Sequence, residues 1–212
     1  MAAGDLIDAL RRGQPVLLPT DTVYGLAAAA ASEPAVAGLY RLKGRAGRQP
    51  VALLAASLEQ LFAAVPELPA RDTAIVRALL PGPFTLVLAN PGGLYPWLTG
   101  SRGETLGVRV PALPHESFRA VETVGCVAAT SANDPGGPDP VTLDDVPARI
   151  RAGCGAELDL GEPRGAELLE GLLGHRHLPR CYSASWIARP APARAPRPRA
   201  PLLRGARAAP RR

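Results

Sequence analysis

Polar side chains that could bind a small charged molecule are crowded into a short stretch near the start of the chain. Thr20, Asp21 and Thr22 directly follow the apolar run Val16–Leu18 and Pro19. An apolar run that ends at a proline is typical of a buried strand leading into a turn. Two hydroxyls and a carboxylate at such a strand end suggest a small-molecule site. The alternative is a plain turn in which the hydroxyls bond their own backbone.

A second cluster combines three cations without an acid. Lys43, Arg45 and Arg48 lie in a glycine-broken loop that ends at Pro50. Lys43 is the only lysine among 24 basic residues, which suggests a site that needs a compact ammonium rather than a planar guanidinium. An ammonium and a guanidinium two residues apart can converge on one polyanion, such as a phosphate chain. The alternative is a solvated basic loop.

Two further positions place polar groups on or near predicted strands. Arg109 stands between two valines in Gly107–Pro111, so it is either an inward cation that needs an anionic partner or an edge residue that faces water. Ser131 and Asn133 follow a strand predicted at Cys126–Ala129 and lie on the same side of an extended segment. They could bond a ligand's carboxylate or the edge of a purine, or equally form a helix N-cap or an Asx-turn.

Several reaction classes lack their sequence patterns. The chain contains no GxxxxGK[ST] phosphate loop, no GxGxxG after a strand, no HExxH motif and no serine-hydrolase elbow. His175 and His177 lie in a glycine-flanked loop and are predicted to be exposed rather than metal-bound. We therefore expect no metal held by the protein's side chains. We expect a cation-plus-hydroxyl site that binds a nucleotide and a small polar substrate, which is poorly suited to covalent catalysis.

The elements that must position these residues alternate between helices and short strands. Apolar spacing and capping signals predict helices over residues 5–12, 32–42, 71–80, 115–124 and 146–152, and another that begins at the Ser57/Gln60 capping box. Apolar runs predict strands at residues 16–18, 51–55, 84–89, 107–111, 126–129, 157–160 and 184–188. Strands alternating with helices at this density indicate an α/β domain.

Length, charge and composition set the remaining bounds. The 212 residues suffice for one core, and we predict a single domain over residues 5–188. Residues 189–212 hold eight arginines and no acid, and this Pro/Ala/Arg-rich tail is expected to be flexible apart from residues 202–206. Residues 1–188 have a net charge of −3. Three scattered cysteines and no long apolar segment predict a cytoplasmic chain without a membrane span.

The clusters occur in an order that resembles one protein family. The motifs that carry the resemblance are Pro19–Leu26, Lys43–Arg45, Pro81–Leu88, Gly107–Pro111 and Thr130–Asn133. In sequence, order and spacing they are similar to those of the YrdC-type threonylcarbamoyl-AMP synthases in their short, single-domain form. The resemblance covers residues 5–150. It implies a single twisted, open α/β sheet with flanking helices around a positively charged cavity.

The resemblance also implies an enzymatic reaction. L-Threonine, bicarbonate (or CO2) and ATP, the last with Mg2+, would form threonylcarbamoyl-adenylate and pyrophosphate. This nucleotidyl transfer is the first step toward N6-threonylcarbamoyladenosine at position 37 of tRNAs that read ANN codons. A separate machinery would then transfer the threonylcarbamoyl group to tRNA. Binding of double-stranded RNA is a further expectation from the resemblance.

The same resemblance implies roles for individual residues. Four residues would bind threonine: Thr22, Arg109, Ser131 and Ser185. Arg109 would pair with the threonine carboxylate, and Ser183 is the alternative to Ser185. Five residues would bind ATP: Lys43, Arg45, Thr105, Asn133 and Arg204. Of these, Lys43 and Arg45 are the expected catalytic residues.

The chain departs from the family pattern in several places. Ala46–Gln49 intervenes before Pro50, and Leu113-Pro114 stands where the family usually has His-Pro. Cys181–Ile187 replaces a Gly-rich segment that ends in Ser-Thr-Val-Val. These changes keep open a non-catalytic nucleotide- or RNA-binding paralogue. The arginine-rich tail could add weak tRNA contacts, although the acidic body and its few aromatics argue against a dedicated nucleic-acid-binding module.

Overall fold

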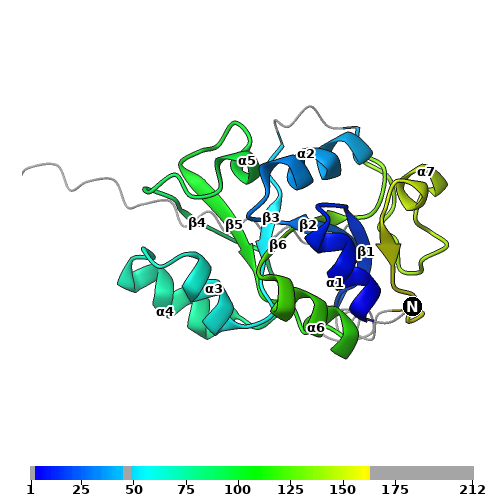
Figure 1. Cartoon of the computed structure of the whole chain (residues 1–212). Coiled ribbons are helices and arrows are strands. Elements are labelled where there is room, and N and C mark those ends of the chain that lie inside the picture. Colours follow the sequence, from blue (N-terminus) through cyan, green and yellow to red (C-terminus); the bar gives the residue numbers. More distant parts are fainter. Residues whose placement is uncertain (1–2, 45–48, 163–212) are drawn as a thin grey trace, which may run out of the picture.

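The computed structural model of the protein describes residues 3–44 and 49–162 (Figure 1). Its centre is one seven-stranded mixed sheet with the order β4-β5-β3-β6-β2-β1-β7. The strands are β1 (Val16–Pro19), β2 (Tyr24–Ala29), β3 (Ala52–Leu54), β4 (Leu86–Ala89), β5 (Thr105–Arg109), β6 (Val127–Ser131) and β7 (Ala156–Glu157). The helices are α1 (Ala3–Arg11), α2 (Glu33–Leu42), α3 (Leu58–Ala64), α4 (Ala70–Leu79), α5 (Pro96–Thr99), α6 (His115–Val124) and α7 (Ala148–Ala152). The predicted α/β fold class, a single open sheet with flanking helices, is confirmed.

Helices cover both sides of this sheet. On one side, Leu17, Leu26 and Val108 pack with side chains of α2 and α5, and α3 and α4 add to the same core. On the other side, α1 and α6 lie next to each other (Figure 1) and cover Leu18 and Val127. Because side chains alternate along a strand, adjacent residues such as Leu17 and Leu18 belong to different cores. None of the helices within the described ranges is long and apolar enough to cross a membrane.

Local capping signals account for two of the predicted helices. Ser32 caps α2, since its side chain accepts a hydrogen bond from Ala35 N at 3.3 Å. Ser57 caps α3 in the same way and accepts from Gln60 N at 3.2 Å. The other half of the expected capping box differs, because Gln60 Oε1 accepts from Ala56 N at 2.7 Å instead of bonding the cap residue itself.

Several strands differ from the predictions, and β5, for example, runs from Thr105 to Arg109 rather than over residues 107–111. β6 extends through Thr130 and Ser131 rather than ending at Ala129, because these residues pair with Leu26 and Gly25 of β2. β2 forms from an alanine-rich stretch for which the sequence predicts no strand. Alanine has little preference for strands, so pairing with β1 on one side and β6 on the other holds this segment extended. β7 has only two residues, of which Glu157 alone lies in the strand predicted at residues 157–160, and the strand predicted at residues 184–188 lies outside the described residues.

Part of the sheet on the α1 and α6 side carries small, partly exposed residues. Ala52 pairs with Ala129 of β6, and Gly107 lies beside Ala52 on β5. Ser131 lies two residues beyond Ala129 on the same face and pairs with Gly25. Most residues that alternate with these along the strands are buried. We call Ala52, Gly107, Ala129 and Ser131 the open strip, because these small residues are partly exposed on one face of the sheet.

Two buried cysteine thiols should make the stability of the protein depend on pH in the alkaline range. Burial raises the pKa of Cys126 from 9.0 to about 11 and that of Cys154 from 9.0 to about 12. The folded state therefore disfavours both thiolates. The resulting stabilisation of the folded state is complete below pH 9. It is lost as the pH rises through the pKa values that the two thiols have in the folded state. We expect the free energy of unfolding to fall by about 2 kcal/mol per thiol between pH 8 and pH 10.5.

Urea denaturation at the two pH values measures this effect. The doubly substituted Cys126→Ala, Cys154→Ala protein should be less stable at pH 8 because of the lost side-chain volume. It should also lose much less stability on going to pH 10.5 than the unmodified protein does. Equal losses of stability in both proteins would show that these thiols do not titrate with the raised pKa values.

Candidate functional site

The turn between β1 and β2 carries the first predicted cluster. Thr20 Oγ1 donates to Val23 O at 2.7 Å and accepts from Val23 N at 3.3 Å, so this hydroxyl shapes the turn itself. Ser117 Oγ of α6 donates to Pro19 O at 2.9 Å and fixes the start of the turn against that helix. The alternative of a hydroxyl bonded to its own backbone is therefore correct for Thr20. The two side chains that follow Thr20 make contacts outside the turn.

Arg109 reaches this turn from the end of β5. Its Nη2 donates to Asp21 Oδ1 at 2.5 Å and to Thr22 Oγ1 at 2.9 Å. The side chains of Arg109 and Asp21 are only 18% and 9% exposed. Arg109 is thus the inward cation with an anionic partner, not the edge residue that faces water. Its buried Nε has no hydrogen-bond partner among residues 3–44 and 49–162, although buried donors are normally paired.

Lys43 follows the last residue of α2 and enters the second cluster. Its Nζ donates to Ser131 O at 2.8 Å, to Asn133 Oδ1 at 2.9 Å and to Asn133 O. The residue is fully buried, so the alternative of a solvated loop is wrong for Lys43. An ammonium has three hydrogens, and here each has an acceptor in one short segment, which fixes that segment. Arg45 and Arg48, the other cations of this cluster, lie outside the described residues.

Ser131 and Asn133 bond each other and the loop that follows them. Ser131 Oγ donates to Asn133 Oδ1 at 2.7 Å. Asn133 Nδ2 donates to Gly137 O at 2.8 Å and to Asp139 Oδ1 at 3.3 Å. The Asn133 amide therefore holds the loop in place, which agrees with the alternative interpretation of this residue as part of a turn. Ser131 belongs to the open strip, and its partly exposed hydroxyl is the member of this pair that can reach a ligand.

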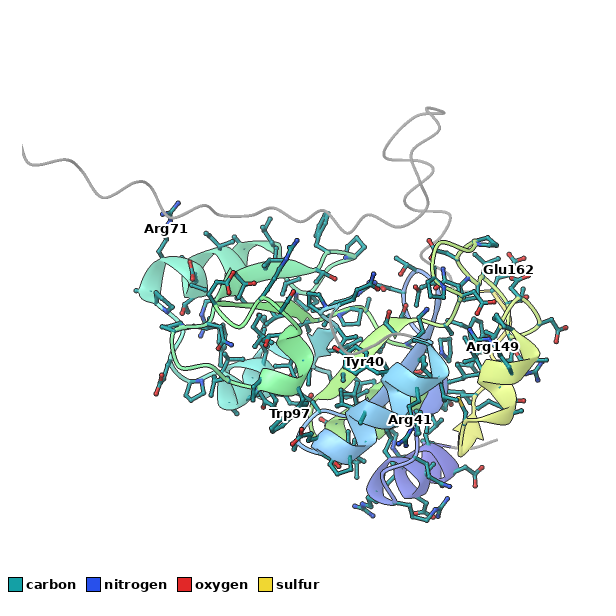
Figure 2. All side chains as sticks on the ribbon, turned by 90° about the horizontal axis from the view of Figure 1, so that it is seen from above. Tyr40, Arg41, Arg71, Trp97, Arg149 and Glu162 are labelled. Carbon is teal, nitrogen blue, oxygen red and sulfur yellow. The ribbon has the colours of Figure 1, made fainter. Side chains whose placement is uncertain are left out.

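An arginine of α7 connects the two segments that carry Lys43 and Asn133. Arg149 donates from Nη1 to Leu42 O and from Nη2 to Asp134 Oδ1. Leu42 directly precedes Lys43, and Asp134 directly follows Asn133. Figure 2 shows α7, which carries Arg149, beside the C-terminal end of α2. Nothing in the sequence distinguishes Arg149 from the other arginines, so it is a supporting residue that only the structure finds.

β2 links the two clusters. Its residue Gly25 pairs with Ser131, and Ala132 N donates to Tyr24 O at 2.9 Å. Tyr24 lies two residues after Thr22 and three residues after Asp21. The Arg109 cluster (Asp21, Thr22 and Arg109) and the Lys43 cluster (Lys43, Ser131 and Asn133) therefore flank one short backbone segment. The open strip extends from β5, two residues before Arg109, to β6 at the Lys43 cluster.

Tyr24 joins the first cluster to the end of the described chain. Its hydroxyl donates to Gly161 O at 2.9 Å and to Asp159 Oδ1 at 3.1 Å, and it accepts from Leu160 N at 3.1 Å. Burial raises the pKa of Tyr24, so the hydroxyl stays neutral at physiological pH. The Gly161 N–H holds the pKa of Asp159 below its usual range, with a smaller effect from Tyr24. The Tyr24 hydroxyl has a packing role here.

Thr105 is a predicted site residue that the structure does not bring to either cluster. Thr105 begins β5, where its hydroxyl donates to Arg102 O at 3.4 Å. Four residues of strand, about 13 Å, separate it from Arg109 at the other end of β5. Thr105 nevertheless lies on the same face as Gly107, at the end of the open strip. Ser185 and Arg204 lie outside the described residues.

A separate hollow beside α7 contains none of the predicted site residues. It has a volume of about 370 Å³ and is lined by Arg151, Ala152, Cys154, Gly155, Ala156 and Glu157. Arg151 already pairs with Glu157 at 2.7 Å and with Asp144 at 3.2 Å. We therefore place the candidate site at the open strip and its two flanking clusters. Within the described part of the chain, no three His, Cys, Asp or Glu side chains are grouped so that they could hold a metal ion.

Comparison with known proteins identifies the family. The model of the Sua5/YciO/YrdC family, which carries the description "Telomere recombination", matches residues 8–167. The chain belongs to this family. The match includes every residue of both clusters that the structure describes, and it confirms the resemblance drawn from the five motifs.

Named relatives show how much of the chain is shared. A Nitrosococcus oceani threonylcarbamoyl-AMP synthase is 31% identical over 167 residues, which cover 79% of this chain and 84% of that protein. A Pyrococcus abyssi threonylcarbamoyl-AMP synthase is 36% identical over 157 residues, which cover 73% of this chain and 45% of that protein. The crystal structure of P. abyssi Sua5 complexed with L-threonine is 34% identical, with a TM-score of 0.67. It covers 76% of this chain and 47% of that one, so this chain corresponds to less than half of the P. abyssi protein.

Proposed function

We propose that this protein is a threonylcarbamoyl-AMP synthase. It would condense L-threonine, bicarbonate or CO2, and ATP into threonylcarbamoyl-adenylate, with release of pyrophosphate and, where bicarbonate is the reactant, of water. The observation that carries the proposal is the placement of Arg109 with Thr22 and of Lys43 with Ser131 on either side of the open strip. The two reactants could meet there, with threonine beside Arg109 and ATP beside the segment that Lys43 fixes. Relatives that bear the synthase name and a Sua5 structure that holds L-threonine support the assignment.

Threonine would bind at the Arg109 cluster. A planar guanidinium matches the two oxygens of a carboxylate, and the unpaired Nε of Arg109 supplies a donor for one of them. The Thr22 hydroxyl lies on the same guanidinium and could bond the substrate from one side. The small residues of the open strip would leave room for the threonine side chain and for the nucleotide beside it.

ATP would bind toward the Lys43 cluster, with Mg2+ entering as part of that substrate. When the threonine carbamate attacks the α-phosphate and pyrophosphate leaves, negative charge builds on phosphate oxygens, and fixed cations stabilise it. The chain needs no nucleophile of its own for this step. Its main task is to position the reactants, for which effective molarity can supply roughly 7–11 kcal/mol at best. Arg45, Ser185 and Arg204 remain predicted participants.

The product would serve N6-threonylcarbamoyladenosine formation in tRNA, through a separate transfer machinery. Weak tRNA contact by the arginine-rich tail, binding of double-stranded RNA and a cytoplasmic location also remain predictions. Deleting residues 189–212 tests the tail, since tRNA binding that is unchanged by the deletion would contradict a contact there.

Pyrophosphate release tests the proposal directly. Purified protein with ATP, Mg2+ and bicarbonate should release pyrophosphate only when L-threonine is added. Arg109→Lys keeps the charge but loses the planar fork, and it should raise the KM for threonine about tenfold or more while changing the KM for ATP much less. Arg119→Lys is the matched control, because Arg119 is exposed on α6 and lies outside both clusters.

Three outcomes are distinguishable. Threonine-dependent release that is weakened by Arg109→Lys and unchanged by Arg119→Lys supports the synthase. ATP that raises the melting temperature without any pyrophosphate release points to the non-catalytic paralogue. Release that does not depend on threonine contradicts the proposed substrate.

A further inference from the structure

The proposed role of Arg109 leaves the adjacent Asp21 unexplained. Asp21 Oδ1 accepts from Arg109 Nη2 at 2.5 Å, and its side chain is 9% exposed. A carboxylate at this position competes with a ligand carboxylate for the same guanidinium. A site built only to bind carboxylates would be stronger without it, so Asp21 calls for a function of its own.

The contact between the two side chains fills only part of the guanidinium. Nε and Nη2 form one edge of an arginine side chain, and the two N–H groups of that edge match the two oxygens of a carboxylate. Asp21 and Thr22 both bond Nη2, whereas the buried Nε has no partner among the described residues. The internal pair is therefore incomplete. A ligand carboxylate could bond both nitrogens once Asp21 moves aside.

The charges of the pair indicate which ligand can make that exchange. Arg109 and Asp21 together have no net charge. A ligand with only a carboxylate would leave Asp21 ionised and unpaired in a mostly buried place, which is unfavourable. A ligand with both a carboxylate and an ammonium would leave neither residue unpaired, and it would replace one internal ion pair by two intermolecular ones.

We propose that Asp21 and Arg109 together select a zwitterionic α-amino acid. The ligand carboxylate takes the Nε and Nη2 edge of Arg109, and the ligand ammonium takes the carboxylate of Asp21. In the free protein each residue serves as the counterion of the other. This inference rests on the proposed function and deepens it, since it makes Asp21 the residue that requires a free amino group on the substrate.

Specificity of this kind depends on a repulsive element as well as an attractive one. A 2-hydroxy acid presents a hydroxyl where the amino acid presents an ammonium, so it meets the Asp21 carboxylate without a compensating charge. The site should therefore reject such acids even though Arg109 attracts their carboxylates. Without Asp21 the same acids should bind well.

Calorimetric titration of the full chain tests the proposal, with L-threonine and 2,3-dihydroxybutanoate as the two ligands. The second ligand differs from threonine only by a hydroxyl in place of the ammonium. Unmodified protein should prefer threonine about 10- to 100-fold. Asp21→Asn should weaken threonine about tenfold or more and strengthen the hydroxy acid, so that the preference falls close to one.

Asp144→Asn is the matched control. It removes the carboxylate of another Arg–Asp pair, with Arg151, where Asp144 is 96% exposed and outside the candidate site. It should leave the preference for threonine unchanged. Asp21→Glu keeps the charge, and it should keep most of the preference even if its longer side chain weakens both ligands.

The outcomes separate this inference from the proposed function. If Asp21→Asn binds threonine more tightly than the unmodified protein, Asp21 only competes for Arg109 and the inference is wrong. An unchanged preference in that variant would also overturn it. If Asp21→Asn does not fold, the unmodified protein still decides, since equal affinity for both ligands contradicts the inference. Unmodified protein that binds no threonine, with or without ATP, overturns the proposed function and this inference together.

Discussion

Lys43→Ala is expected to cost the protein both stability and activity. Lys43 is fully buried, and its ammonium donates to Ser131 O, Asn133 O and Asn133 Oδ1. Alanine would leave these acceptors without their donor and would also leave a cavity. We expect the free energy of unfolding to fall by about 3 kcal/mol or more. For a chain of this length, that corresponds to a drop of roughly 6–12 °C in melting temperature.

Urea denaturation and pyrophosphate release measure the two effects separately. Lys43→Met keeps most of the side-chain volume, so the difference between Met and Ala gives the cost of the cavity. Arg41→Ala removes an exposed cation from the last turn of α2, two residues before Lys43, and it should change the free energy of unfolding by less than about 0.5 kcal/mol. Activity is compared at a temperature where all variants are folded. A Lys43→Ala protein with unchanged stability would show that the three hydrogen bonds contribute little.

Gly107→Leu is expected to abolish activity while preserving stability. A Cβ at Gly107 would meet only Thr85 Cγ2 at 3.5 Å and Ala52 Cα at 3.8 Å, which are ordinary contacts. The leucine side chain would then project over the open strip, where we place the substrates. A larger residue than glycine also restricts the unfolded chain, so the strand should not be weakened. We expect pyrophosphate release to fall at least about 100-fold, a loss of roughly 2.7 kcal/mol in transition-state stabilisation.

A graded series makes this prediction specific. Gly107→Ala adds only the Cβ, and it should lose far less activity than Gly107→Leu. Gly4→Leu is the control, because Gly4 is exposed on α1 and a Cβ there has nothing within 4 Å. Full activity in Gly107→Leu would place the substrates elsewhere. A large loss of stability in that variant would show that the strip is packed rather than open.

Local signals predict the helices and some of the strands, but not the centre of the sheet. Ser32 and Ser57 predict where α2 and α3 begin, because an N-cap residue bonds a backbone N–H only three residues further along the chain. β2 has no comparable signal. Its Gly and Ala residues have little preference for strands, and the pairing with β1 and β6 that holds them extended comes from distant parts of the chain.

Local sequence signals also predict part of the candidate site. Thr22, Lys43, Arg109 and Ser131 stand out as polar groups at strand ends or beside apolar runs, and the structure gathers them at two neighbouring clusters. Their partners do not follow from spacing, since Asp21 and Arg109 are 88 residues apart. The burial of Lys43 is equally invisible in the sequence, because a Lys-Gly-Arg segment looks like a solvent-exposed loop until Asn133 is placed beside it.

The position of β7 has a consequence for how the protein is made. β1 pairs with β2 on one side and with β7 on the other, and Ala156 pairs with Val16, 140 residues earlier in the chain. At 5–20 residues per second, a ribosome needs roughly 7–28 s to synthesise the segment between them. During that time the outer edge of β1 presents unpaired backbone groups to other nascent chains. The strand that precedes the turn with Asp21 and Thr22 is therefore fully paired only after nearly all of the described chain has emerged.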